Sequence, residues 1–101
     1  LPGHLPLLSA IKPGILRYYQ GETVTQAAID VGYAEAGPGK VSVLTEGYLT
    51  PDRIDVDAVY LELAEAEKKQ AAFEEVLEGP AYEQMQRAQA WARARLQAAG
   101  K

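Results

Sequence analysis

Glycine and proline are distributed unevenly along this chain of 101 residues, and their distribution divides it near residue 50. Most of the glycines and four of the six prolines lie before residue 51. Between residues 52 and 99 the only such interruption is the pair Gly79-Pro80. Because these two residue types form tight turns and end helices, the first half favours short strands and the second half favours long helices.

The first half contains short runs of strand-forming residues between turn signals. The strands that we expect cover residues 7–11, 15–20, 23–31, 33–36 and 40–45. The last run alternates with period two, so Val41, Val43 and Thr45 share one face. Short strands without intervening helices predict an antiparallel sheet, sandwich or barrel over residues 1–50.

The second half, residues 51–101, predicts an antiparallel hairpin of two helices, about 23 and 20 residues long, separated at Gly79-Pro80. Helical spacing assigns these positions to the buried stripe of the first helix: Val56, Val59, Tyr60, Leu63, Ala66, Gln70, Phe73 and Leu77. The stripe of the second helix comprises Met85, Ala88, Ala92, Leu96 and Ala99. The fold class is therefore α+β, with an antiparallel β module followed by a C-terminal helical hairpin. Since many hairpin residues are alanines, we expect weak contacts that could rearrange.

Composition excludes several function classes. The formal net charge of −4 disfavours a nucleic-acid partner, which needs a basic face. The absence of cysteine excludes disulfides, thiol catalysis and cysteine-based metal sites. No apolar run approaches the roughly 18 residues of a membrane span, so we expect no direct membrane insertion.

No group of residues in the sequence predicts a catalytic or metal site. His4 is the only histidine, and we interpret it as a turn or interface residue. The segment around Gly39-Lys40 resembles a phosphate loop only superficially, because Ala34 and Val41 stand where glycine and Ser or Thr are required. The glutamates of the first helix are interpreted as a solvated face. Trp91 is either a packing anchor or a partner contact.

Residues 1–17, LPGHLPLLSAIKPGILR, resemble the signature P-G-H-x-P-L-[LV]-[ST]-[AP]-[IL]-K-P-G of the bacterial F-type ATP synthase epsilon subunit. Residues 32–45, GYAEAGPGKVSVLT, resemble a second segment of that family, with Ala36 at its usual valine. The resemblance extends over the whole chain and implies a β-sandwich followed by a helical hairpin. It also implies that an N-terminal segment, carrying the first strands of the sandwich, is absent before Leu1.

The resemblance implies a non-catalytic rotor subunit of the central stalk, without a cofactor, that helps couple proton flow to ATP synthesis. Its partners would be the gamma subunit and the c-ring, and also the alpha and beta catalytic subunits through the hairpin. The hairpin would be a candidate inhibitor of ATP hydrolysis. The subunit would lie peripherally on the cytoplasmic face of the bacterial inner membrane. The residues that we expect at partner contacts are Pro2, Gly3, His4, Lys40, Arg87, Arg93 and Arg95.

Nucleotide-sensing members of the family carry [IL]-D-x-x-R-A at the start of the first hairpin helix. Here Ile54 and Asp55 match, but Ala58 stands in place of the arginine, whose guanidinium matches a phosphate. Arg93 and Arg95 are two positions apart on a helix and therefore point in different directions. We expect no ATP sensing by this hairpin.

Two alternatives stay open at this point. The chain could be a stand-alone protein-interaction module, or a ligand-binding accessory of an enzyme that uses Asp55 and Arg87.

Overall fold

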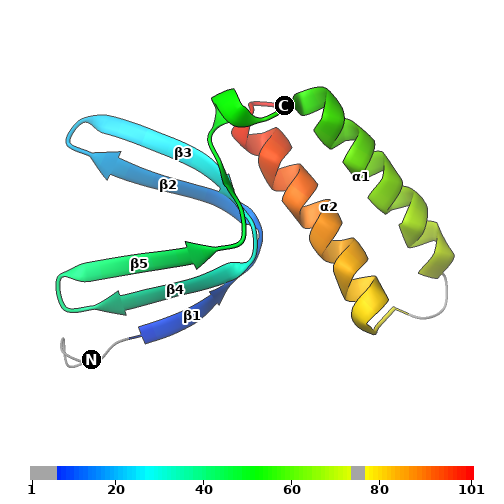
Figure 1. Cartoon of the computed structure of the whole chain (residues 1–101), viewed down its shortest axis with the longest axis horizontal. Helices are drawn as coiled ribbons and strands as arrows, with labels where there is room; N and C mark the ends of the chain where they lie inside the picture. Colours follow the sequence, from blue (N-terminus) through cyan, green and yellow to red (C-terminus); the bar gives the residue numbers. More distant parts are fainter. Residues whose placement is uncertain (1–6, 74–76) are drawn as a thin grey trace.

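The computed structural model describes residues 7–73 and 77–101. In chain order the strands are β1 (Leu7–Ile11), β2 (Gly14–Gln20), β3 (Thr23–Ile29), β4 (Gly32–Gly37), β5 (Lys40–Thr45) and β6 (Tyr48–Leu49). The helices α1 (Val56–Gln70) and α2 (Pro80–Ala98) follow, with short 3₁₀ turns at Pro51–Arg53 and Ala71–Phe73 (Figure 1). The prediction of a β-sandwich followed by two packed helices is confirmed.

Two three-stranded antiparallel sheets make up the sandwich, in the strand orders β1-β4-β5 and β2-β3-β6. The chain passes between the sheets at residues 12–13, 30–31 and 46–47, and turns within one sheet at residues 21–22 and 38–39. Because neighbouring strands are antiparallel, all three passages lie at one end of the sandwich, next to α2, and both turns lie at the other end (Figure 1). The sheets converge at the α2 end and diverge toward the turns.

Glycine makes both turns possible. Gly21 and Gly39 have φ angles of 64° and 68°, in the left-handed region that other residues rarely adopt. The β4–β5 register pairs Gly37 with Lys40, Ala36 with Val41 and Ala34 with Val43, which confirms the alternation predicted for β5. The superficial phosphate-loop segment is therefore a β-hairpin turn.

Several predicted boundaries were wrong. The strand expected over 23–31 ends at Ile29, because Asp30 and Val31 carry the chain to the other sheet. Strand β6 was missed, since a run of two residues gives no periodicity. The first hairpin helix has 15 residues rather than about 23. It begins at Val56 because Ile54 is extended, and it gives way at Ala71 to a 3₁₀ turn that contains Phe73.

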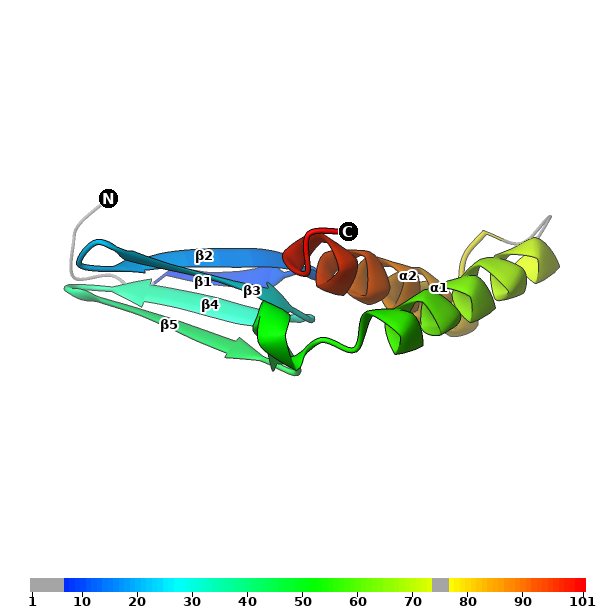
Figure 2. The same cartoon turned by 90° about the horizontal axis from the view of Figure 1, so that it is seen from above.

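Helix α2 is buried on two faces and lies between the sheets and α1 (Figures 1 and 2). One face, with Ala94 and Ala98, packs on Ala28 of β3, and Ile15, Ile54 and Trp91 surround this contact. The other face, with Ala92 and Leu96, packs on Val59 of α1, next to Ile54, Val56 and Leu63. The predicted stripes were therefore wrong in part: Tyr60, Gln70, Leu77 and Ala88 are exposed. The second buried face of α2 follows from its contact with the sheet.

Candidate functional site

The hairpin meets the sandwich where two of the passages between the sheets run side by side. We call residues 30–31 and 46–47 the crossover corner. The backbone N–H of Asp30 donates to the carbonyl of Gly47 at 3.0 Å, and the N–H of Glu46 donates to the carbonyl of Val31 at 3.0 Å. Paired backbone hydrogen bonds hold the two passages as one unit, although each belongs to a different connection between the sheets.

The Thr45 side chain ties this corner together. Its hydroxyl lies 2.8 Å from the carbonyl oxygen of Asp30 and 3.0 Å from that of Gly47. The Gly47 N–H in turn points at the same hydroxyl, at 3.3 Å. One hydroxyl thus serves backbone groups of both passages, which a side chain without a polar atom could not do.

Arg87 of α2 binds a carboxylate from each passage. Its Nε donates to Asp30 Oδ1 at 3.2 Å and its Nη2 to Asp30 Oδ2 at 3.0 Å. The same Nη2 also donates to the carboxylate of Glu46. Hydrogen bonds to Asp30, and then to Glu46, favour the charged guanidinium and raise the pKa of Arg87 above its ordinary value. Asp30 is buried, and Arg87 compensates the cost of removing its charge from water.

Trp91, one helical turn after Arg87, packs on the same corner. A Cβ atom added at Gly47 would lie 2.9 Å from Cζ2 of Trp91, so the indole lies directly against that glycine. The Arg95 guanidinium carbon lies 4.8 Å from the centre of the indole. Of the two interpretations left open for Trp91, the structure supports the packing anchor.

Polar contacts also join the two helices. Arg95 Nη1 donates to Glu62 Oε2 of α1 at 2.7 Å, and the Arg95 side chain is largely buried. Gln89 is buried, and its Nε2 donates to Gln70 Oε1 at 2.8 Å. Arg93 is exposed. The three arginines expected at partner contacts thus have different environments: Arg87 and Arg95 bind carboxylates within the chain, whereas exposed Arg93 donates from Nη1 to Gln89 Oε1 at 3.5 Å.

The two residues that match the nucleotide-sensing motif have structural roles. Asp55 is the N-cap of α1, and its Oδ1 accepts from the N–H of Ala58 at 3.2 Å. Ile54 packs against both apolar clusters of the hairpin. Asp55 and Arg87, which one alternative placed in a common ligand site, are engaged with different partners.

Other expected contact residues lie away from the hairpin. Lys40 is exposed at the β4–β5 turn, at the end of the sandwich opposite the crossover corner. Pro2, Gly3 and His4 lie outside the described residues. Their contacts with partner subunits stay predictions.

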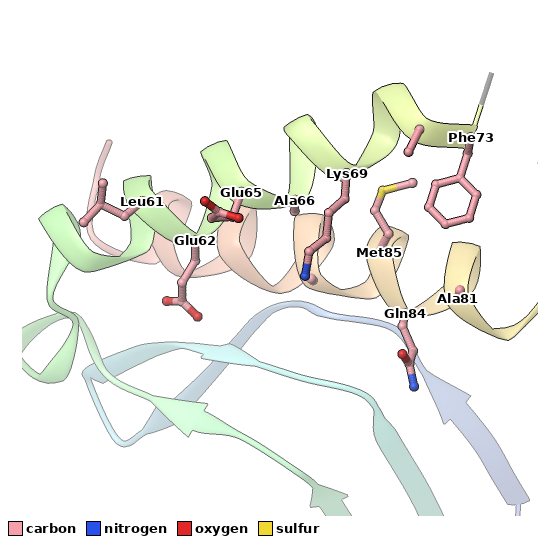
Figure 3. Close-up of a pocket in the computed structure, with 11 residues that line it drawn as sticks. Leu61, Glu62, Glu65, Ala66, Lys69, Phe73, Ala81, Gln84 and Met85 are labelled. Carbon is pink, nitrogen blue, oxygen red and sulfur yellow. The ribbon is translucent and has the colours of Figure 1, made fainter.

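A groove of about 640 Å³ runs between the two helices (Figure 3). Phe73 and Met85 lie at one end of it, and Leu61 lies at the other. Two carboxylates, Glu62 and Glu65, and one ammonium group, Lys69, also line it. Because the lining is apolar with an excess of negative charge, the groove disfavours a polyphosphate. Among residues 7–73 and 77–101, no cluster of side chains has the composition of a metal site.

Sequence reasoning missed the crossover corner. Asp30, Thr45 and Glu46 lie at strand ends, where neither periodicity nor a motif marks them. The one available signal was Asp30 itself, an acidic residue placed directly after an apolar strand.

Comparisons with known proteins agree with the fold. Residues 1–51 match the family described as ATP synthase, Delta/Epsilon chain, beta-sandwich domain. The ATP synthase epsilon chain of Gloeothece citriformis is 37% identical over 102 residues, which cover 99% of this chain and 72% of the relative. That of a Synechococcus strain is 37% identical over 98 residues, covering 97% of this chain and 73% of the relative.

A relative outside the cyanobacteria also matches. The ATP synthase epsilon chain of Halalkalibacterium halodurans is 35% identical over 69 residues, which cover 68% of this chain and 52% of the relative. The segment expected before Leu1 stays a prediction. No helix in the described part of the chain is long and apolar enough to cross a membrane. The chain therefore belongs to the ATP synthase epsilon chain family, whose members are non-catalytic subunits of the central stalk of the F-type ATP synthase.

Proposed function

We propose that the chain links the gamma subunit to the c-ring of an F-type ATP synthase, peripherally on the cytoplasmic face of a bacterial inner membrane. The match over nearly the whole chain to ATP synthase epsilon chains carries this proposal. The sheets offer apolar contact surface, since Leu8, Tyr33 and Leu44 are more than half exposed.

The contacts with gamma and the c-ring involve residues 2–4 and the β4–β5 turn. Lys40 supports this assignment, because it is exposed at the end of the sandwich that the hairpin leaves free. Cysteines placed at His4 and Lys40 should cross-link to gamma or c subunits in the assembled complex, whereas a cysteine at the exposed Ala64 of α1 should not. Cross-linking only from the cysteine at position 64 would show that the hairpin, rather than the sandwich, faces gamma and the c-ring.

Residues 1–50 form the rotor-binding unit and residues 51–101 form the regulatory unit. The last strand ends at Leu49 and the first helical turn begins at Pro51, which supports a boundary between them. The hairpin restrains ATP hydrolysis through contacts with the alpha and beta subunits, for which exposed Arg93 is available as a cation.

Deletion of residues 80–101 tests the regulatory role. We expect ATP hydrolysis by the complex to rise, while assembly and synthesis persist, because the sandwich makes the rotor contacts. A matched deletion of residues 52–101 should give the same rise, since α1 is held mainly through α2. Unchanged hydrolysis in both deletions would leave the hairpin as a passive brace.

Nucleotide does not control this hairpin. Ala58 stands where the sensing arginine would be, and Asp55 is already engaged as the α1 N-cap. Titration of the full chain with ATP should show no micromolar binding by calorimetry. Micromolar binding would overturn this part of the proposal.

A further inference from the structure

The crossover corner contains two of the three passages between the sheets, so a change in the relation between the sheets affects it. Both of its passages carry the chain from one sheet to the other, at residues 30–31 and 46–47. No side chain of α1 is among the groups hydrogen-bonded to this corner in the described residues. The side-chain hydrogen bonds between the corner and the hairpin in the described residues therefore come from α2.

Helix α2 contacts the corner through two side chains one turn apart. Arg87 binds Asp30 and Glu46, one carboxylate from each passage. Trp91 covers Gly47, and a Cβ atom added at this glycine would also lie 3.3 Å from Cβ of Asp30. A guanidinium that binds one carboxylate from each passage depends on their relative position, because hydrogen bonds weaken steeply as distance and angle change.

The rest of the contact between α2 and the sheet has a centre of small side chains, with the partly buried Ile15 and Ile54 packed against it. Its buried members are Ala28, Ala94 and Ala98, which carry one methyl group each. A methyl group contributes little apolar area, so the position of α2 depends strongly on the polar contact and on Trp91.

We propose that Arg87 is a positioning residue that couples the docking of α2 to the conformation of the crossover corner. This inference rests on the proposed function only in taking the hairpin as the regulatory element. A partner that displaces the two passages relative to each other weakens the hold on α2, and release of α2 loosens the corner in turn. Such coupling is reciprocal by thermodynamic linkage.

The experiment uses the fluorescence of Trp91 in the full chain, since this is its only tryptophan. Arg87→Gln should increase acrylamide quenching of Trp91 about twofold and shift its emission to the red, because the indole leaves the corner. Arg87→Lys keeps the positive charge but loses the planar guanidinium that donates two parallel hydrogen bonds. Its Trp91 quenching should therefore fall between that of Arg87→Gln and that of wild type. Arg93→Gln is the matched control on the same helix and should leave Trp91 unchanged.

A second set of variants tests the coupling, by changing the crossover corner without changing any residue of α2. Thr45→Val removes the hydroxyl that joins the passages and should also increase Trp91 quenching, whereas Thr23→Val at the far end of β3 should not. Glu46→Gln removes one exposed partner of Arg87 with little risk to folding and should give a smaller increase. Far-UV circular dichroism establishes that each variant keeps its helices.

The outcomes separate this inference from the proposed function. If Trp91 quenching in Arg87→Gln equals that in Arg93→Gln, Arg87 is not a positioning residue and the inference is wrong. If Thr45→Val leaves Trp91 unchanged, the coupling is wrong. If Trp91 is released in both variants while ATP hydrolysis by the complex stays at the wild-type rate, the coupling stands and the regulatory role of the hairpin fails.

Discussion

Asp30 and Arg87 lie 57 positions apart in the chain and meet through two hydrogen bonds, at 3.2 and 3.0 Å. Their burial is unequal: 11% of the Asp30 side chain is accessible, against 42% of the Arg87 side chain. A carboxylate removed from water needs a partner more than an exposed guanidinium does. The pair therefore joins the sandwich and the hairpin through Asp30, its more buried member.

Gly32 should be indispensable to the β4–β5 ladder. A Cβ atom at this position would lie 1.9 Å from the carbonyl oxygen of Leu44 and 2.7 Å from the Cα of Thr45, both in backbone that cannot move aside. We expect Gly32→Ala to lower the free energy of unfolding by about 3 kcal/mol or more. Gly37→Ala, where nothing lies within 4 Å, is the control and should have little effect in the same urea titration. Equal effects would contradict the close approach at Gly32.

The contact between β3 and α2 should not tolerate a larger side chain. Ala28 is completely buried against Ala94 and Ala98. Ala28→Leu should destabilise the chain by about 1–3 kcal/mol, because the helix must move away to make room. Ala64→Leu, at an exposed position of α1, should change stability by less than about 0.5 kcal/mol. Thermal unfolding of the two variants provides the comparison, and a neutral Ala28→Leu would show that α2 is not packed there.

Arg95 should contribute more to the free energy of unfolding than Glu62, the carboxylate that it binds. Its side chain is largely buried, stacks on Trp91 and reaches Glu62, which is 56% accessible. Arg95→Ala removes packing as well as charge and should cost about 2 kcal/mol. Glu62→Gln removes only an exposed partner and should cost about 0.5 kcal/mol. A larger loss in Glu62→Gln, by urea unfolding, would contradict this order.

The tyrosine pair that joins β2 to β6 should make stability depend on alkaline pH. The hydroxyls of Tyr18 and Tyr48 lie 2.8 Å apart, and this hydrogen bond raises the pKa of Tyr48. Since the folded state favours the protonated phenol, its contribution is present below the unfolded pKa of about 10 and is lost as pH rises through the folded pKa. Urea midpoints should fall more steeply above about pH 10 in wild type than in Tyr48→Phe. If the urea midpoints of wild type and Tyr48→Phe fall in parallel with pH, the tyrosine pair does not cause the pH dependence.

The sequence predicted the regular parts of the fold because local chemistry determines them. The turns at Gly21 and Gly39 require positive φ angles, and the alternation of β5 follows from a sheet with unlike faces. Tertiary contacts determined what was missed. The first hairpin helix, expected to have about 23 residues, starts at Val56, because Ile54 packs against two apolar clusters and Asp55 caps α1.

The buried stripe of α2 was predicted as a single face, because periodicity shows that a helix is amphipathic but does not show how many other elements pack on it. Ala94 and Ala98 are buried only because β3 packs on the side of the helix that α1 does not cover. Arg87 could be singled out as a cation, but its partners could not be named. A contact across 57 positions leaves no trace in local spacing.

The position of α2 between the sheets and α1 also affects folding during synthesis. The ribosome synthesises α1 before α2, so α1 at first lacks its main packing partner. A helix of 15 residues is marginal alone in water, so it forms and melts until α2 packs on it. Helix α2 therefore completes two interfaces at once, one with β3 and one with α1, and a chain that lacks it also loses the packing of α1.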